Sequence, residues 1–419
     1  MKITIYISKN NEYNYIRKFY DVADFLYCYD CHRHFNTGKR VEDIIYNRIN
    51  TFRRIDVLRC DAKKENIKGE LIMSNPIRIG VVGLGRIGMS VHFNCLKERP
   101  DKYKVVAACD LIPERAEKYA EEFGCRTYTD IKEFIADPEI EVVDIATRSC
   151  DHYAHAKAAL LAGKSVLVEK PFCQTYSEAC ELIELGSQPN GPHIYVRHNR
   201  RFEEGFIKIN EIIDSGILGD VYEIKLTRNG YQRRNDWQTI KEFGGGQLLN
   251  WGPHIVDHAI WFCGGKYTEM HADIKRVAAV GDAEDHIKLV FKGINHRIVD
   301  MEISGGVAID TPEYMIYGTK GSLVGCGKSF KLKYLDPAVT LDKIEADPST
   351  PDGPSYGTEE ILPWKEETVT LEGGDKTVVI WDYFYEAYRN HKPYPITLDQ
   401  ATEVVRTIEN AKIGTEFAK

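Results

Sequence analysis

A glycine triplet, Gly83-Leu-Gly85-Arg-Ile-Gly88, follows directly on a β-branched run at residues 77–82 and opens a stretch of helical character. Such triplets occur in many turns, so the triplet alone is a weak signal. Here Asp110 follows the next apolar run, at residues 105–109, and lies 22 residues after Gly88. A strand, a glycine turn, a helix and a second strand followed by an acidic residue are typical of a dinucleotide-binding βαβ unit.

Each glycine of the triplet has a predicted physical role. Gly83 permits the tight turn, Gly85 lets the backbone approach a pyrophosphate, and Gly88 lets the helix pack on the strand. The free N–H groups at the helix N-terminus favour phosphate binding. Asp110 is predicted to accept hydrogen bonds from the adenosine ribose and to repel a 2′-phosphate, which favours NAD over NADP; a solvated turn carboxylate is the alternative. Arg115 is close enough in sequence to accommodate a 2′-phosphate, so NADP stays open.

Short apolar runs alternate with amphipathic stretches between residues 73 and 198. The helix signals between them are Pro113 in a first turn, Gly124 at a helix end, Asp151 as a cap and the capping box Thr175-Tyr-Ser-Glu178. This alternation predicts an α/β domain with a parallel, doubly wound sheet. The predicted strands are 77–82, 105–109, 142–146, 165–168 and 194–196.

Residues 1–72 differ in composition from the rest of the chain. They hold 14 Lys/Arg against 10 Asp/Glu and no proline, although the whole chain has 16 prolines and a net charge of −8. Because Met73 opens a stretch that resembles a natural protein start, one hypothesis is that residues 1–72 are upstream sequence; a small helical extension is the alternative. The segment Cys28-Tyr-Asp-Cys31-His32, with His34, resembles haem-attachment and zinc patterns but lacks an export signal and a second ligand pair. We therefore predict no metal site.

Composition and charge exclude several classes of protein. The 419 residues are 43% hydrophobic and 28% charged, which excludes disordered and collagen-like chains. A net charge of −8 disfavours nucleic acid as a partner. No run approaches the roughly 18 apolar residues of a membrane helix, so no membrane partner is predicted. Eleven scattered cysteines fit a reducing compartment, and we expect a cytoplasmic protein.

A longer signature, Ala162-Gly-Lys-Ser-Val-Leu-Val-Glu169-Lys170-Pro171, follows in the same domain. This signature resembles that of the glucose–fructose oxidoreductase, inositol dehydrogenase and MocA (Gfo/Idh/MocA) family. Three further stretches resemble the same family: Asn199-Arg-Arg-Phe202, the glycine run that starts at Gly244 and leads to His254, and Ile316-Tyr-Gly-Thr-Lys-Gly321. The resemblance implies a Rossmann domain at 73–198 and a C-terminal substrate-binding α/β domain at 199–419 with an open, mostly antiparallel sheet. One face of that sheet typically mediates homodimer or homotetramer formation in the family.

Lys170 is the first candidate catalytic residue. It lies at the C-terminal end of a predicted parallel strand, beside the crevice where ligands bind in doubly wound sheets. Its ammonium could stabilise a substrate alkoxide, and Pro171 could fix the loop, through a cis bond for instance. The alternative is a surface lysine. The resemblance implies the catalytic role, because family members carry this lysine in a Glu-Lys-Pro motif.

His254 is the second candidate, four residues after Asn250, so the two share a face if the stretch is helical. A histidine suits a general base, and a histidine bonded within the domain interface is the alternative. The resemblance implies that His254 works with Lys170. Asn250 departs from the family pattern, which commonly has Asp there; an amide cannot accept a proton, but it can hold His254 or a sugar hydroxyl.

A further departure is Arg148, because proline commonly follows the family threonine that is equivalent to Thr147. Arg148 could contact the cofactor or an acidic substrate, or be a solvated loop residue. The predicted cofactor-binding residues are Gly83, Gly85, Arg86, Ile87, Gly88, Asp110, Arg115, Thr147, His152, Glu169 and Lys170.

The C-terminal part gives coarser predictions. Residues 270–280, 285–292 and 297–303 alternate like half-buried strands, and 336–374 is predicted to form long surface loops. A capping box, Thr397-Leu-Asp-Gln400, begins a final helix that ends near Gly414.

The predicted function is hydride transfer between NAD (NADP as alternative) and a secondary alcohol of a sugar, sugar derivative or cyclitol. Two other classes stay open. Some relatives hold NAD tightly, oxidise a sugar transiently and eliminate a glycosidic bond, and a few are non-catalytic regulators that bind dinucleotide.

Overall fold

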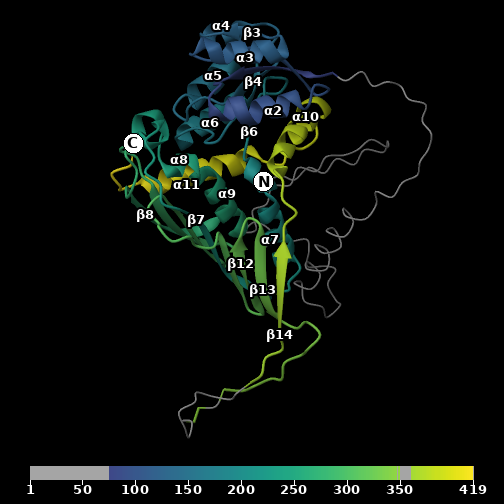
Figure 1. The fold of residues 1–419 in the computed structure, drawn as a ribbon, viewed down its shortest axis with the longest axis vertical. Coiled ribbons are helices and arrows are strands. Elements are labelled where there is room, and N and C mark those ends of the chain that lie inside the picture. The colour runs from purple at the N-terminus through teal and green to yellow at the C-terminus, as the bar shows by residue number, and fades with distance from the viewer. Residues whose placement is uncertain (1–74, 347, 350–359, 419) are drawn as a thin grey trace, which may run out of the picture. The chain divides into compact units, whose positions relative to one another are not determined.

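The computed structural model describes residues 75–346, 348–349 and 360–418. The predictions for residues 1–72, including the Cys28-Tyr-Asp-Cys31-His32 segment, lie outside the described residues. Two β-sheets, each with its own hydrophobic core, organise the described chain (Figure 1).

The first sheet is the predicted doubly wound parallel sheet, in the order β3-β2-β1-β4-β5-β6. The side chains of its central strands are almost all buried, because helices cover both faces of such a sheet. The strand order reverses between β1 and β4, which creates a ligand-binding crevice at their carboxyl ends. The strands are β1 Ile77–Val82, β2 Tyr103–Cys109, β3 Arg126–Tyr128, β4 Val142–Ile145, β5 Ser165–Val168 and β6 Ile194–Val196.

The helix signals around this sheet are confirmed with one exception. Pro113 lies in the first turn of its helix and Gly124, at φ = 65°, ends it; both hydrogen bonds of the Thr175–Glu178 capping box form. Asp151 occupies the cap position but makes no capping hydrogen bond, because its carboxylate accepts from Arg148 Nε at 3.1 Å instead. The helices are a π-helical turn Gly88–His92 that leads into α2 Phe93–Lys97, then α3 Pro113–Phe123, α4 Ile131–Ala136, α5 His152–Leu161 and α6 Tyr176–Leu185.

The second sheet is the predicted open, mostly antiparallel sheet, in the order β14-β13-β12-β11-β7-β10-β9-β8. Only the β7–β10 pair is parallel among the strands that the structure describes. Assembly through this sheet stays a prediction. The strands are β7 Val221–Asn229, β8 Tyr267–Lys275, β9 His286–Gly293, β10 Ile298–Ser304, β11 Tyr314–Gly318, β12 Gly321–Cys326, β13 Ser329–Leu335 and β14 Trp364–Thr370.

Helices of the C-terminal part contact both cores. Trp381 and Phe384 of α10 belong to the core of the parallel sheet, and Figure 1 shows α10 beside α2. Helix α11 contributes Val405 to that core and Val404 to the second one, so it joins the two sheets. The helices are α7 Glu204–Asp214, α8 Gln247–Asn250, α9 Gly252–Phe262, α10 Ile380–Asn390 and α11 Leu398–Lys412, with 3-10 turns Asn199–Phe202, Trp237–Thr239, Lys241–Phe243 and Lys376–Val379.

The prediction that residues 336–374 are surface loops is wrong in part. Strand β14 lies within this range and pairs with β13 from Ser329↔Thr370 to Leu335↔Trp364. Nearly all of its side chains are exposed, so the apolar alternation that reveals other strands is missing. None of the helices in the described part of the chain has the length and apolar character that a bilayer span requires.

Candidate active site

The turn after β1 has the geometry that a bound pyrophosphate needs. Gly83 has φ = 87°, and an added Cβ there would lie 2.5 Å from the backbone nitrogen of Thr147. An added Cβ at Gly88 would lie 2.4 Å from the Gly83 carbonyl oxygen, so helix and turn are in direct contact. At Gly85, by contrast, an added Cβ would meet no described atom within 4 Å, and this backbone is open to a ligand. Two further residues of the turn, Arg86 and Ile87, line the adjoining cavity.

Asp110 lies beside this turn, directly after β2. Its Oδ2 accepts from the Leu84 N–H at 2.7 Å and its Oδ1 accepts from the Ile112 N–H at 2.9 Å. Nη1 of Arg115 is 3.5 Å from the same Oδ1, so the predicted ribose acceptor and the predicted 2′-phosphate partner are neighbours. A carboxylate has about four acceptor sites, so Asp110 can still accept from ribose hydroxyls. The residues present therefore fit a dinucleotide.

Other predicted cofactor residues lie at the carboxyl ends of β4 and β5. Glu169 and Lys170 line the cavity, and the Lys170–Pro171 peptide is cis, as the sequence suggested. His152 is buried, with its ring nitrogens 2.7 Å from the Pro171 carbonyl oxygen and 3.1 Å from that of Thr147. Burial lowers the pKa of His152, and the neutral ring has one N–H, which can donate to one of these two carbonyl oxygens.

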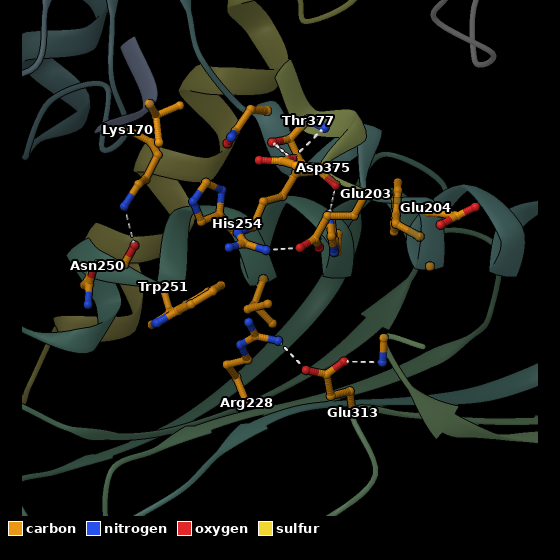
Figure 2. A pocket seen from close by; sticks show the side chains of 18 of the residues that line it. Lys170, Glu203, Glu204, Arg228, Asn250, Trp251, His254, Glu313, Asp375 and Thr377 are labelled. Carbon is orange, nitrogen blue, oxygen red and sulfur yellow. Dashed lines mark hydrogen bonds and ion pairs between the residues drawn. The ribbon is translucent and has the colours of Figure 1, made fainter. Parts of the chain in front are cut away.

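Lys170, Asn250 and His254 lie at one wall of the cavity (Figure 2). Nζ of Lys170 donates to the backbone carbonyl oxygen of Asn250 at 2.8 Å, while Oδ1 of Asn250 accepts from Gln238 Nε2 at 3.2 Å. The helical spacing predicted for Asn250 and His254 is interrupted at Trp251, where α8 ends and α9 begins. Nδ1 of His254 is buried and has no hydrogen-bond partner among the described residues. The ring of His254 itself lines the cavity.

The surroundings determine the protonation of both side chains. Burial lowers the pKa of Lys170 to about 8, with Arg200 adding to the effect and Glu169 opposing it. Burial, followed by the charges of Lys170 and Arg200, lowers the pKa of His254 well below its ordinary value. At neutral pH His254 is thus an uncharged ring, while Lys170 can exchange a proton near neutrality. Lys170 can therefore move a proton at a substrate hydroxyl, with the uncharged His254 beside it.

A buried set of four charged residues, which was not predicted from the sequence, adjoins Lys170. Nδ1 of His92 lies 2.6 Å from Asp144 Oδ2 and Nε2 lies 2.9 Å from Glu169 Oε1, which also pairs with Arg197. Although burial opposes each shift, Asp144 raises the pKa of His92, and Arg197 and His92 lower that of Glu169. Asp144 is the residue from which the sequence could have predicted this set. It lies within an apolar strand, and a buried carboxylate needs a partner.

The cavity beside these residues has a volume of about 1100 Å³. Lys170 and residues of the glycine turn, α8, α9 and β7 line it, and Figure 2 shows Lys170, Asn250, His254 and Arg228 among them. Eight Lys/Arg and six Asp/Glu line it. Such a lining suits a ligand with many hydroxyl or charged groups.

Two family models match the chain. The oxidoreductase family model with the NAD-binding Rossmann fold matches residues 77–191, and the GFO/IDH/MocA C-terminal domain model matches residues 206–324. The chain belongs to the Gfo/Idh/MocA family. It therefore carries an NAD(P)-binding Rossmann domain and is an oxidoreductase of this family.

Curated relatives and solved structures agree with this assignment. An uncharacterized oxidoreductase of Schizosaccharomyces pombe is 31% identical over 265 residues, which are 60% of this chain and 71% of the relative. The scyllo-inositol 2-dehydrogenase (NADP(+)) IolW of Bacillus subtilis is 25% identical over 351 residues, 80% of this chain and 92% of the relative. A solved oxidoreductase from Bacillus cereus is 24% identical, with a TM-score of 0.67 over 81% of this chain and 98% of its own, and shares the fold.

Proposed function

We propose that this protein transfers a hydride between a nicotinamide cofactor and a secondary alcohol of a sugar, sugar derivative or cyclitol. The observation that carries the proposal is Lys170, which lines a cavity beside the glycine turn, has a pKa of about 8 and is oriented by the Asn250 carbonyl at 2.8 Å. The uncharged His254 lies at the same wall. The similarity to a scyllo-inositol 2-dehydrogenase supports a polyhydroxylated ring as substrate.

Proton transfer at the substrate hydroxyl is the task of the protein side chains. In the direction of oxidation, uncharged Lys170 donates one hydrogen to the Asn250 carbonyl and keeps its lone pair for the hydroxyl proton. The ammonium that forms stabilises the negative charge developing on the substrate oxygen. The uncharged ring of His254, which lines the same cavity, offers a further hydrogen bond to the same or a neighbouring hydroxyl. The bound nicotinamide supplies the hydride acceptor or donor.

For the cofactor we favour NAD over NADP. The Asp110 carboxylate, held by two backbone N–H groups, supports ribose binding and would repel a 2′-phosphate. Arg115 is the residue that opposes this preference, because it lies 3.5 Å from that carboxylate. The printed name of the Bacillus subtilis relative specifies NADP(+), so both cofactors belong in the test.

A screen of sugars, sugar acids and inositols with NAD and with NADP tests the proposal. We expect formation of reduced nicotinamide with at least one polyol, faster with NAD. The Lys170→Met variant is the control, because it removes the ammonium and keeps the aliphatic chain.

Two outcomes of the screen would contradict the proposal. Cleavage of a glycoside without net NADH would indicate transient oxidation followed by elimination. Dinucleotide binding without turnover of any probe would indicate a non-catalytic binding protein.

A further inference from the structure

Two arginines share one indole ring at the cavity wall. The Cζ atom of Arg228 lies 4.0 Å from the ring centroid of Trp251, and that of Arg200 lies 4.3 Å from it (Figure 2 labels Arg228 and Trp251). The ring of Trp251 is also 6.0 Å, between centroids, from that of His254. Because Asn250 precedes Trp251 and binds Lys170 through its carbonyl, this pair of cations lies next to the proposed reacting groups.

Both guanidinium groups are fixed in place and still have N–H groups to offer. Nη1 of Arg200 donates to Glu203, and Nη1 of Arg228 donates to Glu313. In the part of the chain that the structure describes, Nε and Nη2 of these two arginines have no acceptor. An arginine carries five N–H donors, so each side chain keeps donors for a ligand.

The electrostatics of this wall favour an anion. The side chains of Arg200 and Arg228 are only 28% and 33% exposed, so water screens their charges incompletely. Burial, followed by the charge of Arg228, lowers the pKa of Arg200 to about 10, which means that the surroundings destabilise the cation. The whole chain has a net charge of −8, but the residues that line this cavity include two more basic than acidic side chains.

We propose that Arg200 and Arg228, held on Trp251, form a subsite for a carboxylate of the substrate, so that the protein acts on an acidic sugar or an acidic cyclitol. A planar carboxylate matches the donor fork of a guanidinium, and the indole fixes the plane of each group. Glu203 and Glu313 disfavour a dianionic phosphate, because they already place negative charge beside both arginines. The inference rests on the proposed function and specifies its substrate class.

Binding to the complex with NADH, followed by nicotinamide fluorescence, tests the subsite. The probes are matched pairs, D-glucose with D-glucuronate and D-galactose with D-galacturonate, together with D-glucose 6-phosphate. We expect the acid of at least one pair to bind more tightly than the neutral sugar and the phosphate. Arg228→Gln should reduce that preference by about 10- to 100-fold, because a hydrogen bond to a charged group is lost.

Arg234→Gln is the matched control, because Arg234 lines the same cavity and pairs with its neighbour Asp236 at 2.6 Å without contacting Trp251 within the described chain. It should leave the ratio of acid to neutral affinity unchanged. The proposed subsite would be contradicted if acid and neutral sugar bound equally in both pairs, or if neither acid bound. It would also be contradicted if D-glucose 6-phosphate bound most tightly. If neutral polyols are still oxidised, the proposed function survives that result; if no probe is oxidised, the proposed function fails.

Discussion

The rate of hydride transfer should depend on pH through Lys170. Burial lowers the pKa of this lysine from 10.5 to about 8. At pH 7 about one Lys170 in ten is then uncharged, against about one in 3000 for a lysine of ordinary pKa. The buried position thus increases the population that can accept the hydroxyl proton by a factor of roughly 300. His254 adds no step in this range, because its pKa lies well below the ordinary value.

The assay is single-turnover oxidation of a polyol substrate between about pH 6 and pH 10. We expect the rate to rise about tenfold per pH unit and to level off above a midpoint near pH 8. Lys170→Arg is the matched control, because a guanidinium keeps its proton throughout this range, and its profile should be flat. A rate without pH dependence, or a midpoint near the pKa of an ordinary lysine, would refute the role of uncharged Lys170.

Four further substitutions test the geometry of the dinucleotide turn and the role of the buried charges. Asp110→Ser should relax discrimination against NADP, because the ribose acceptor and the repulsive charge are both lost; an unchanged ratio of kcat/KM for NAD and NADP would contradict the ribose role. Gly85→Ala should weaken dinucleotide binding at unchanged Tm, whereas Gly88→Ala, whose Cβ would lie 2.4 Å from a carbonyl oxygen, should lower Tm; the reverse pattern would contradict the geometry of the turn. His92→Gln should lower the free energy of unfolding by about 3 to 5 kcal/mol below pH 6.5, and urea unfolding should show the loss shrinking as pH rises through the raised pKa of His92. A loss independent of pH would show that the charge of His92 does not stabilise the fold.

Local signals in the sequence predicted much of the fold. The glycine turn and both capping boxes depend on contacts within a few residues, so a short stretch of sequence contains all the information they need. The parallel sheet could be predicted because its buried strands form continuous apolar runs. Strand β14 could not, since it pairs along one edge of the second sheet with nearly all of its side chains exposed.

The contacts of the site depend on residues far apart in the chain. Lys170 donates to the backbone carbonyl of Asn250, which is 80 residues away in the chain. Every residue has a backbone carbonyl, so the residue types in the sequence could not predict this hydrogen bond. His92 meets Asp144 across 52 residues, and only the folded sheet brings them together. Arg228 similarly reaches Trp251 from β7.

Single-turnover NADH formation by Lys170→Met tests most directly whether Lys170 handles the hydroxyl proton. The glycine turn and Asp110 should still bind the dinucleotide, because neither contains the altered side chain. Hydride transfer should slow by a factor on the order of 10² to 10⁴, the range for losing acid–base assistance. Near-normal hydride transfer in this variant would contradict the assignment, and loss of dinucleotide binding would show that the lysine has a structural role instead.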